Sequence, residues 1–335
     1  MSGGVDSSAA ALLLRDAGDC MGVTLTMFPD AEEQNAADAR RVCDTLGLPH
    51  ATWDASAAFR QYVTDYFADA YAHGLTPNPC VVCNRHVKFG FLLDRAIDAG
   101  YDTVATGHYA RIWKGGGRRL VQKAADAKKD QSYVLAMLTT EQLSHVAFPL
   151  GALSKPEIRA MAEEAGLVTA HKSDSQDICF IPDGDYNAFL TRYTGKAAIP
   201  GDFLAPDGRK VGTHRGQRCY TIGQCRGLGI ALGCRMYVTA KDAEANTVTI
   251  DANENTLYRT RVVCRRFNNQ TGARLPDGMV CAAKLRYAHR ESPCRVWESD
   301  GGLVLEFDTP QRAPTPGQFA VLYDGDMVLG GAEIL

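Results

Sequence analysis

The first residues of the chain form a pattern that suits an anion. Ser2-Gly3-Gly4-Val5-Asp6-Ser7-Ser8 leads into an Ala- and Leu-rich stretch that we expect to be helical over 7–16. Two glycines let the backbone approach an anion closely, the serines add hydroxyl donors, and a helix N-terminus favours negative charge. The GxxxxGK[ST] pattern is absent, which argues against a loop built for γ-phosphate transfer. Asp6 is a candidate ligand for Mg²⁺ on a phosphate, because this cation prefers carboxylate and phosphate oxygens.

A second pattern places two cysteines ahead of basic residues. Residues 76–84 read TPNPCVVCN and contain Cys80 and Cys83, and a helix is expected over 87–99. We expect Cys83 to lie just before this helix. There the pKa of its thiol would be lowered, and the thiol made nucleophilic, by its basic neighbours Arg85, His86 and Lys88. Another cysteine, Cys179, follows much later, within KSDSQDICFI at 172–181.

Three chemistries fit these cysteines. A CxxC pair is half of a zinc site, but no second CxxC or paired histidine follows at ligand spacing. Cys80, Cys83 and Cys179 are also a candidate ligand set for an Fe–S cluster with one open iron. Alternatively, Cys83 and Cys179 are a reactive pair that handles sulfur. The remaining cysteines, out of 11 in the chain, are expected to pack as small apolar side chains.

The elements that must position these residues change type along the chain. Up to about residue 195, helical stretches alternate with strand-like ones at 19–28 and 101–106, which predicts a parallel sheet with helices on both faces. From residue 196 onward, Gly and Pro separate short Val-, Ile- and Tyr-rich segments, as in small sandwiches or barrels. We therefore expect an α/β domain followed by two small β domains, with bounds at 1–195, 196–258 and 259–335.

In a parallel sheet of this kind, a strand leads into the phosphate-binding loop, which lies at the carboxyl end of the strand. The printed sequence begins at Met1, directly before Ser2, so it lacks that first strand. A gap in the middle of a parallel sheet would leave backbone groups unpaired. We therefore expect the strand to lie upstream of the printed start rather than to be absent from the domain.

Composition and charge exclude several classes of protein. The 335 residues are 45% apolar and 22% charged, which excludes a disordered or collagen-like chain, and the apolar runs are too short for a membrane helix. Because residues 1–6 do not resemble an export signal, we expect the cysteines to be thiols in a reducing cytoplasm. The net charge of −3 hides an asymmetry, since residues 259–295 carry nine basic and two acidic side chains. Such a stretch suits phosphates, although a solvated strand face would have the same composition.

The loop resembles the SGGxDS signature of PP-loop ATP pyrophosphatases, which adenylate a substrate oxygen and release pyrophosphate. Further motifs resemble the bacterial tRNA-specific 2-thiouridylases, in order and over essentially the whole chain. They are NPCVVCN with Lys88-Phe89, ATGHYAR at 105–111, KDQSY at 129–133, SQDICFI at 175–181, GDF at 201–203, HRGQ at 214–217, YTIGQ at 220–224, KLRY at 284–287 and PGQ at 316–318. The resemblance implies a PP-loop domain followed by two β domains, of which the last is barrel-like and binds tRNA.

The resemblance also implies roles for single residues. ATP would be bound by the loop from Met1 to Ser8, with Met27 near the adenine and Gly107 against the nucleotide. Asn78, Pro79 and Cys80 would meet the target base. Some members of the family have Asp in place of this cysteine, and a thiol does not supply that carboxylate. The positions that contact tRNA in the family correspond here to His108, Lys129, Asp130, Gln131, Arg286, Tyr287 and Gln318.

The implied reaction is 2-thiolation of the wobble uridine in tRNAs for Lys, Glu and Gln. Attack of the uridine O2 on the α-phosphate of ATP, with Mg²⁺, would give an adenylated base and pyrophosphate. Cys179 corresponds to the cysteine that carries sulfur as a persulfide, and Cys83 corresponds to the nucleophile. Either the persulfide attacks C2 and a Cys83–Cys179 disulfide is left, or Cys83 first releases hydrosulfide. A cysteine desulfurase or a sulfur-relay protein is the implied donor.

Other interpretations stay open beside this one and its Fe–S form. Another PP-loop synthetase acting on a small metabolite is disfavoured by the basic segment at 259–295 and by the Cys83 and Cys179 pair. A non-catalytic RNA-binding protein with a degenerate loop is disfavoured because the loop and both cysteines are intact.

Overall fold

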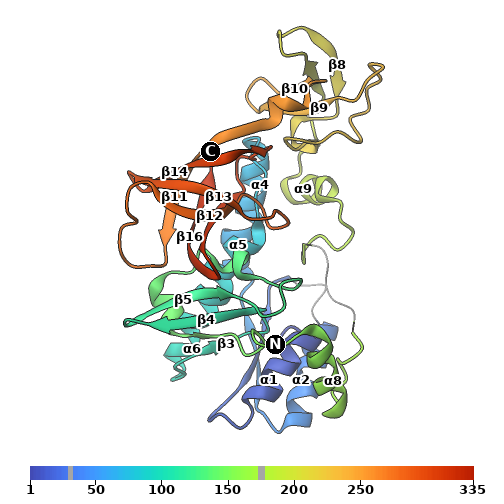
Figure 1. The fold of residues 1–335 in the computed structure, drawn as a ribbon. Helices are drawn as coiled ribbons and strands as arrows, with labels where there is room; N and C mark the ends of the chain where they lie inside the picture. Colours follow the sequence, from blue (N-terminus) through green and yellow to red (C-terminus); the bar gives the residue numbers. More distant parts are fainter. Residues whose placement is uncertain (29–32, 173–177) are drawn as a thin grey trace.

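The computed structural model describes residues 1–28, 33–172 and 178–335. Figure 1 shows three regions in a row: an α/β region that holds the N-terminus, a β-barrel in the middle, and a small β-sheet at the other end. The fold class expected from the sequence is confirmed, since an α/β region is followed by two β regions. Within the described ranges, no helix is both long enough and apolar enough to cross a bilayer.

The α/β region contains two short parallel strand pairs. β1 (Gly22–Thr26) pairs with β2 (His50–Asp54), and β3 (Val104–Ala105) pairs with β6 (Val146–Ala147). In the described chain these pairs form two separate sheets. The helices that alternate with them are α1 (Val5–Leu14), α2 (Glu33–Leu46), α3 (Ser56–Phe59), α4 (Asp65–Ala72), α6 (Leu92–Asp98), α7 (Thr140–Ser144) and α8 (Lys155–Glu164).

One continuous helix, which we call the cysteine helix, carries Cys83. It consists of α5 (Pro79–Cys83), a π-helical stretch at Asn84–Phe91, and α6. The helix starts early because the Asn78 side chain accepts a hydrogen bond from the backbone N–H of Val81 at 3.4 Å, and because proline suits the first turn. The predicted start at residue 87 is therefore wrong. Cys83 lies inside the helix rather than ahead of its N-terminus.

The last strands of the chain close into an antiparallel barrel. Around the barrel the strand order is β11 (Tyr258–Asn269), β14 (Gly302–Arg312), β13 (Ser292–Ser299), β12 (Met279–Lys284), β15 (Phe319–Asp324) and β16 (Met327–Ile334). β16 then pairs back with β11 and closes the ring. Val296, Leu305 and Leu322 are fully buried in its interior.

A hairpin from the α/β region extends the sheet of the barrel. β4 (Ala110–Gly115) pairs with β5 (Arg118–Lys123), and β5 pairs with β16 where Gln122 faces Met327. Sequence analysis did not predict this hairpin. Val121 of β5 belongs to a core cluster that also contains Phe89 of the cysteine helix and Val321 of the barrel. The α/β region and the barrel therefore share one hydrophobic core.

The small sheet lies between the other two regions in sequence. α9 (Tyr186–Thr194) leads into it, and its strand order is β8 (Lys210–His214), β7 (Gly201–Leu204), β10 (Thr247–Asp251) and β9 (Tyr237–Asp242). It has a core of its own, in which Phe203, Tyr220 and Val248 are fully buried.

Candidate functional site

The loop at the start of α1 is shaped by two close backbone approaches. Gly3 has a φ of +65°, and a Cβ there would lie 2.5 Å from the carbonyl oxygen of Asn35. A Cβ on Gly107 would lie 2.7 Å from the carbonyl carbon of Asp6. Glycine is required at both positions because any side chain would collide with backbone atoms. The structure therefore places Gly107 directly against the loop in which we expect the nucleotide.

The loop serines form hydrogen bonds within the protein. Ser8 is fully buried; it donates to the carbonyl oxygen of Gly4 at 2.9 Å and accepts from Thr169 at 2.8 Å. Ser7 donates to the same carbonyl at 3.0 Å and accepts from the backbone N–H of Ser2 at 3.1 Å. The hydroxyl of Ser8 thus shapes the loop, and the backbone N–H groups of the first turn of α1 remain the anion-binding candidates.

Asp6 is paired with groups from two other elements. Its Oδ1 accepts hydrogen bonds from the ammonium group of Lys155 and from the hydroxyl of Tyr109, each at 2.7 Å. Lys155 is the first residue of α8 and is buried, with 8% of its surface exposed. Sequence reasoning missed this lysine, because SKPE reads as an ordinary helix start and only the tertiary fold brings it to the loop.

A second lysine fastens the loop to α2. The ammonium group of Lys172 donates to the carbonyl oxygen of Gly3, to Asn35 Oδ1 and to Asp38 Oδ2, at 2.9 Å in each case. The hydrogen bond from Lys172 holds the pKa of the Asp38 carboxyl below its usual value. Sequence analysis assigned no role to this lysine, although it is the first residue of the KSDSQDICFI segment.

Met1 and Met27 lie at β1, beside the loop. The amino group of Met1 donates to the carbonyl oxygen of Val23. Met27 follows the carboxyl end of β1 and packs, partly buried, against the apolar cluster that contains Cys83. Met27, which we expect near the adenine, thus lies between the end of β1 and the helix that carries Cys83.

Cys83 is buried among apolar side chains. It exposes 7% of its surface and packs in one cluster with Phe59, Val63 and Val87. Burial raises the pKa of its thiol from the ordinary value of 9.0 to about 12, and Lys88 offsets only part of this rise. The expectation of a lowered pKa is wrong, because the desolvation of a thiolate here outweighs the attraction of the nearby ammonium group.

Cys80 and Cys179 lie at the surface of the same region. Both side chains are exposed, yet the surrounding protein shields them enough to raise the pKa of each thiol. After burial and Lys88, the next influences on the pKa of Cys83 are the charges of Cys179 and Cys80, so the three sulfur atoms lie within electrostatic reach of one another. Residues 175–177 of the SQDICFI motif lie outside the described residues.

Aromatic packing anchors the segment that carries Cys179. The ring centroid of Phe180 lies 5.7 Å from that of Phe59 and 5.3 Å from that of Phe67, both in edge-to-face geometry. Phe180 also packs against the cluster that contains Cys83. The residue after Cys179 is therefore packed beside the helix that carries Cys83.

The ammonium group of Lys88 influences the pKa values of several groups in this region. In addition to the larger effect of burial, the charge of Lys88 lowers the pKa values of Cys80, Cys83, Cys179, His108 and the Met1 amino group. Lys88 lies in the π-helical stretch, whose hydrogen bonds join residues five apart, so Cys83 and Lys88 are about one turn apart on the same side of the helix. The three thiols are thus influenced by one ammonium group.

Some of the expected tRNA contacts gather beside Cys80. The hydroxyl of Tyr287 donates to the carbonyl oxygen of Asp130 at 3.2 Å, and its ring is 47% exposed. Burial raises the pKa of Tyr287, the charges of Asp130 and Cys80 raise it further, and Lys129 lowers it. The Asp130 carboxylate itself accepts from the backbone N–H of Ala124 and from the hydroxyl of Ser132. Tyr287 is therefore within electrostatic reach of the exposed thiol of Cys80, and Lys129 is within reach of Tyr287.

Other expected tRNA contacts are buried or hydrogen-bonded to the protein itself. His108 is buried between Phe89 and Phe148, and desolvation holds its pKa well below the ordinary value. The imidazole of His108 packs against apolar rings, and its contact with tRNA stays a prediction. Three more side chains are bound to backbone groups of the protein: Gln131 to Tyr109, Arg286 to Arg312 and Ala313, and Gln318 to Thr76.

Comparisons with known families match nearly the whole chain. A family described as a tRNA methyl transferase HUP domain matches residues 1–183, one described as a tRNA methyl transferase PRC-barrel domain matches 187–252, and one described as an aminomethyltransferase β-barrel domain matches 265–334. The tRNA-specific 2-thiouridylase MnmA of Lachnoclostridium phytofermentans is 44% identical, and the match covers 100% of this chain and 98% of the relative. The MnmA proteins of Chloroflexus aurantiacus and Treponema denticola are 46% and 41% identical, each over 100% of this chain and 96% of the relative.

The chain belongs to the MnmA family of tRNA-specific 2-thiouridylases. Among solved structures, the U34-tRNA thiolase NcsA from Methanococcus maripaludis with its [4Fe-4S] cluster matches with a TM-score of 0.36 and 18% identity, over 58% of this chain and 64% of that chain. That likeness is too distant to support an argument about this MnmA-family chain. Within the described ranges, which include Cys80, Cys83 and Cys179, no three His, Cys, Asp or Glu side chains converge as a metal site.

In this MnmA-family chain, the barrel holds the cysteine helix through polar contacts that sequence analysis missed. Arg85 donates to the carbonyl oxygen of Met137 at 2.6 Å and to Asn268 Oδ1 at 3.1 Å. Asn268 and Gln270 of the barrel both donate to the carbonyl oxygen of Leu138, at 2.8 and 3.2 Å. No sequence signal indicated that Asn268 and Gln270 have this role, because the carbonyl group that they contact belongs to Leu138, which is distant in sequence.

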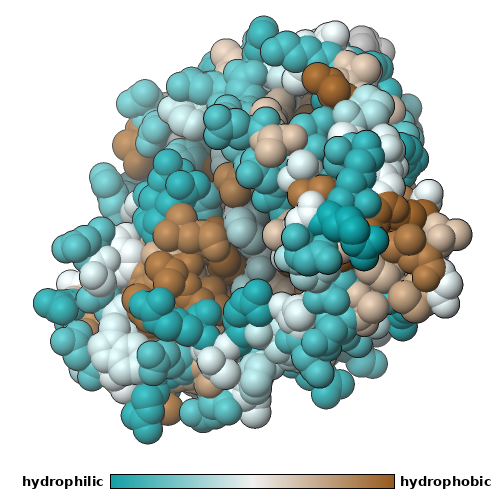
Figure 2. Space-filling view, turned by 90° about the horizontal axis from the view of Figure 1, so that it is seen from above, coloured by the Kyte–Doolittle hydropathy of each residue, from teal (hydrophilic) through white to brown (hydrophobic). Residues whose placement is uncertain are grey.

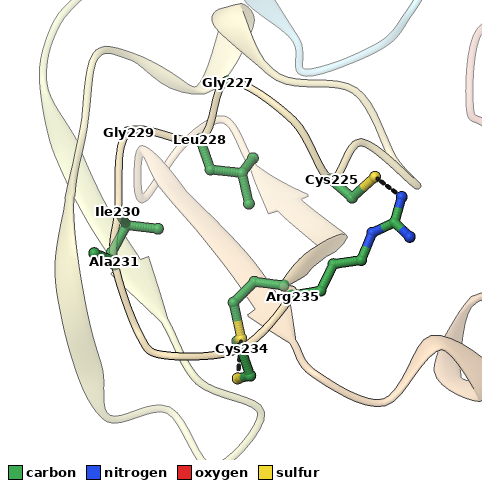
Figure 3. Close-up of a pocket in the computed structure, with 9 residues that line it drawn as sticks. Cys225, Gly227, Leu228, Gly229, Ile230, Ala231, Cys234 and Arg235 are labelled. Carbon is green, nitrogen blue, oxygen red and sulfur yellow. Dashed lines mark hydrogen bonds between the residues drawn. The ribbon is translucent and has the colours of Figure 1, made fainter.

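A pocket lies outside this site, in the region of the small sheet. It has a volume of about 430 Å³, and its lining includes Leu228, Ile230 and Cys234. Figure 3 shows the side chain of Arg235 reaching toward Cys225, and Arg235 donates a hydrogen bond to the sulfur of Cys225 at 3.1 Å. Figure 2 shows that on the face seen from above, apolar side chains gather in separate patches among hydrophilic ones. Because its lining residues all lie between Cys225 and Met236, the pocket is distinct from the phosphate-binding loop and from Cys83 and Cys179.

Proposed function

We propose that this MnmA-family protein makes 2-thiouridine at the wobble position of tRNAs for Lys, Glu and Gln, in an ATP-dependent reaction. The observation that carries the proposal is the packing at the carboxyl end of β1, where Met27, beside the loop, and Phe180, directly after Cys179, both pack against the cluster that contains Cys83. An adenylating site and a sulfur-transfer site must act on the same base, so they must lie side by side.

Adenylation is the task that we assign to the loop. The C2 carbonyl of uridine has no leaving group, so its oxygen must first be activated. Attack of O2 on the α-phosphate of ATP forms an O–P bond and expels pyrophosphate, and the oxygen can then leave with AMP. The N–H groups at the start of α1 would hold the phosphates, with Met27 beside the adenine. In the described chain no hydrogen bond uses Oδ2 of Asp6, so this oxygen would hold Mg²⁺, which stabilises the charge on pyrophosphate.

Sulfur transfer is the task that we assign to the cysteines. In one order, the terminal sulfur of a Cys179 persulfide attacks C2 and AMP leaves. The Cys83 thiolate then attacks the sulfur of Cys179, which frees the thiolated base and leaves a Cys83–Cys179 disulfide. In the other order, Cys83 breaks the persulfide first and hydrosulfide attacks C2. Both orders end with the same disulfide, which a thiol must reduce before the next turnover.

The burial of Cys83 fits the role of a protected second nucleophile. A thiol with a pKa raised to about 12 is mostly protonated at neutral pH, so it does not react at random with oxidants. Its thiolate forms next to Lys88, which is the cation that favours the charged form. Cys179 is exposed, as a residue that receives sulfur from a donor protein must be.

We assign the tRNA-binding role to the barrel and the catalytic role to the α/β region, with divisions near 195 and 258. The target base would be flipped out of its stack to reach Asn78, Pro79 and Cys80. Tyr287 offers an exposed ring for stacking, and Lys129 offers a cation for a phosphate. A tRNA substrate places the reaction in the cytoplasm, and a cysteine desulfurase or a relay protein would load Cys179.

Pyrophosphate release tests the proposal. With ATP, Mg²⁺ and unmodified tRNA, we expect release that depends on tRNA and does not require a sulfur donor. Cys179→Ala should retain this release and lose thiolation, whereas Asp6→Ala should lose release and retain tRNA binding. Release that proceeds equally without tRNA would contradict the proposal and favour a small-metabolite substrate.

A further inference from the structure

The pairing of Lys155 with Asp6 places a cation where a helix disfavours one. Lys155 is the first residue of α8, and the N-terminal end of a helix carries partial positive charge that repels an ammonium group. Its side chain is only 10% exposed, and a buried ammonium group loses most of its hydration. Both effects oppose a lysine at this position, so the contact that it makes must compensate for them.

The surrounding structure fixes the position of Lys155. Ile158 and Ala162 of α8 pack in one cluster with Ala9 of α1, so the two helices are held against each other. A capping box fixes the start of α8, since the Ser154 backbone N–H donates to Glu157 at 2.7 Å. Lys155 is therefore presented to the loop by the fold and does not depend on a bound ligand.

One contact of its ammonium group is with Asp6, which is the only carboxylate in the SGGVDSS motif. The Lys155 ammonium lies 2.7 Å from Asp6 Oδ1 and 5.7 Å from the ring centre of Tyr109, whose hydroxyl donates to the same oxygen. Asp6 brings a carboxylate into the loop in which we expect a triphosphate. Without compensation, that charge would repel the phosphates at short distance through partly desolvated surroundings.

We propose that Lys155 neutralises Asp6 and thereby makes the loop able to accept a nucleoside triphosphate before any metal ion is bound. This inference rests on the proposed function, because it assumes that the loop holds the triphosphate of ATP. Lys155 is a positioning residue for the loop: it acts through Asp6, and it leaves Oδ2 of that carboxylate free for the metal that accompanies the nucleotide.

The test is a double-mutant cycle on nucleotide affinity in the full-length protein. The dissociation constant for ATP is measured by isothermal titration calorimetry in a chelator, without Mg²⁺. We expect Lys155→Met to weaken this affinity about 10-fold or more, because it leaves the Asp6 carboxylate without the neighbouring ammonium group. The combination of Lys155→Met with Asp6→Asn should restore the affinity to within about 2-fold of the wild-type value. A purely structural role for Lys155 would not be rescued by neutralising Asp6.

The matched control is an exposed lysine–aspartate pair in the small sheet. Lys210 lies 2.6 Å from Asp202, with side-chain exposures of 57% and 42%, and Lys210→Met should leave the affinity for ATP unchanged. If Lys155→Met does not fold, Lys155→Arg should bind ATP like the wild type, and the Asp6→Asn single variant should bind Mg²⁺-free ATP at least as tightly as the wild type. Weaker binding by Asp6→Asn, or full affinity in a folded Lys155→Met protein, would overturn the inference. A wild-type protein that binds no ATP, with or without Mg²⁺, would instead overturn the proposed function.

Discussion

The side-chain amide of Gln318 donates a hydrogen bond to the carbonyl oxygen of Thr76 at 2.8 Å, and so joins the barrel to the segment that leads into the cysteine helix. The backbone N–H of Thr76 in turn donates to the carbonyl oxygen of Pro316 at 2.9 Å. The barrel thus holds Thr76 on both sides, shortly before Asn78 caps the helix. A tRNA that binds the barrel, as proposed, would thereby be linked to the position of Cys83.

Removal of this link should slow sulfur transfer more than it affects ATP binding. Gln318→Ala deletes one hydrogen bond, which lowers the free energy of unfolding by about 1 kcal/mol. We expect the thiolation rate to fall several-fold with an unchanged dissociation constant for ATP, as measured by single-turnover assays and calorimetry. The exposed Gln61 offers a control, since Gln61→Ala should alter neither quantity. Equal thiolation rates for Gln318→Ala and the wild type would show that the contact does not couple barrel and helix.

The cysteines should divide into two that are required and others that are not. Cys83→Ser and Cys179→Ser should each abolish thiolation and keep pyrophosphate release, because adenylation uses no thiol. Cys225→Ser and Cys234→Ser, in the separate pocket, should retain both activities. Mass analysis of digested tRNA and a pyrophosphate assay measure the two steps. Thiolation by the Cys179→Ser protein would remove the persulfide assignment.

Sulfur transfer should become faster as pH rises. The pKa of Cys83 is raised to about 12, so the thiolate fraction grows about tenfold per pH unit between about pH 7 and 9. Single-turnover transfer from a preformed adenylate should follow this slope, and Lys88→Met should lower the rate at every pH, because the ammonium group favours the thiolate. A rate that is independent of pH would argue against Cys83 as the attacking thiol.

The same shift has a consequence for stability. Because the folded pKa of Cys83 lies above its ordinary value of 9.0, the buried protonated thiol contributes stability that is fully present below about pH 9 and is lost as pH rises toward 12. Cys83→Ala should flatten the alkaline decline of the free energy of unfolding, as measured by urea denaturation. An unchanged decline would indicate that Cys83 is more solvated than its exposed fraction of 7% implies.

Lys129 and Tyr287 should contribute to tRNA affinity in different ways, Lys129 through its charge and Tyr287 through stacking on a base. Lys129→Ala should reduce the slope of log affinity against log salt by about one, as expected for the loss of one phosphate contact. Tyr287→Ala should weaken binding about 10-fold with little change in slope, because a stacked base is lost, and Tyr287→Phe should retain most of the affinity. Filter binding at several salt concentrations checks both. Lys114→Ala, on an exposed hairpin position, is the control.

The sequence predicted the chemistry-bearing residues better than their surroundings. The SGGVDSS loop and the cysteines were recognisable because their signals are local and ordered. The burial of Cys83 was not, since its apolar neighbours Phe59 and Val63 come from another helix. Lys155 was missed for the same reason, because only the packing of α8 on α1 brings it to Asp6. The burial of His108 between Phe89 and Phe148 could not be read from its motif either, because a motif match carries no information on exposure.

The measurement that tests the central claim most directly is mass analysis of the wobble uridine after a complete reaction. The protein is incubated with unmodified tRNA, ATP, Mg²⁺, and a cysteine desulfurase with cysteine, and the tRNA is then digested to nucleosides. The account predicts 2-thiouridine at the wobble position with wild-type protein, and none when ATP is omitted or when Cys83 or Cys179 is replaced. Pyrophosphate release without any 2-thiouridine, or 2-thiouridine formed without ATP, would contradict it.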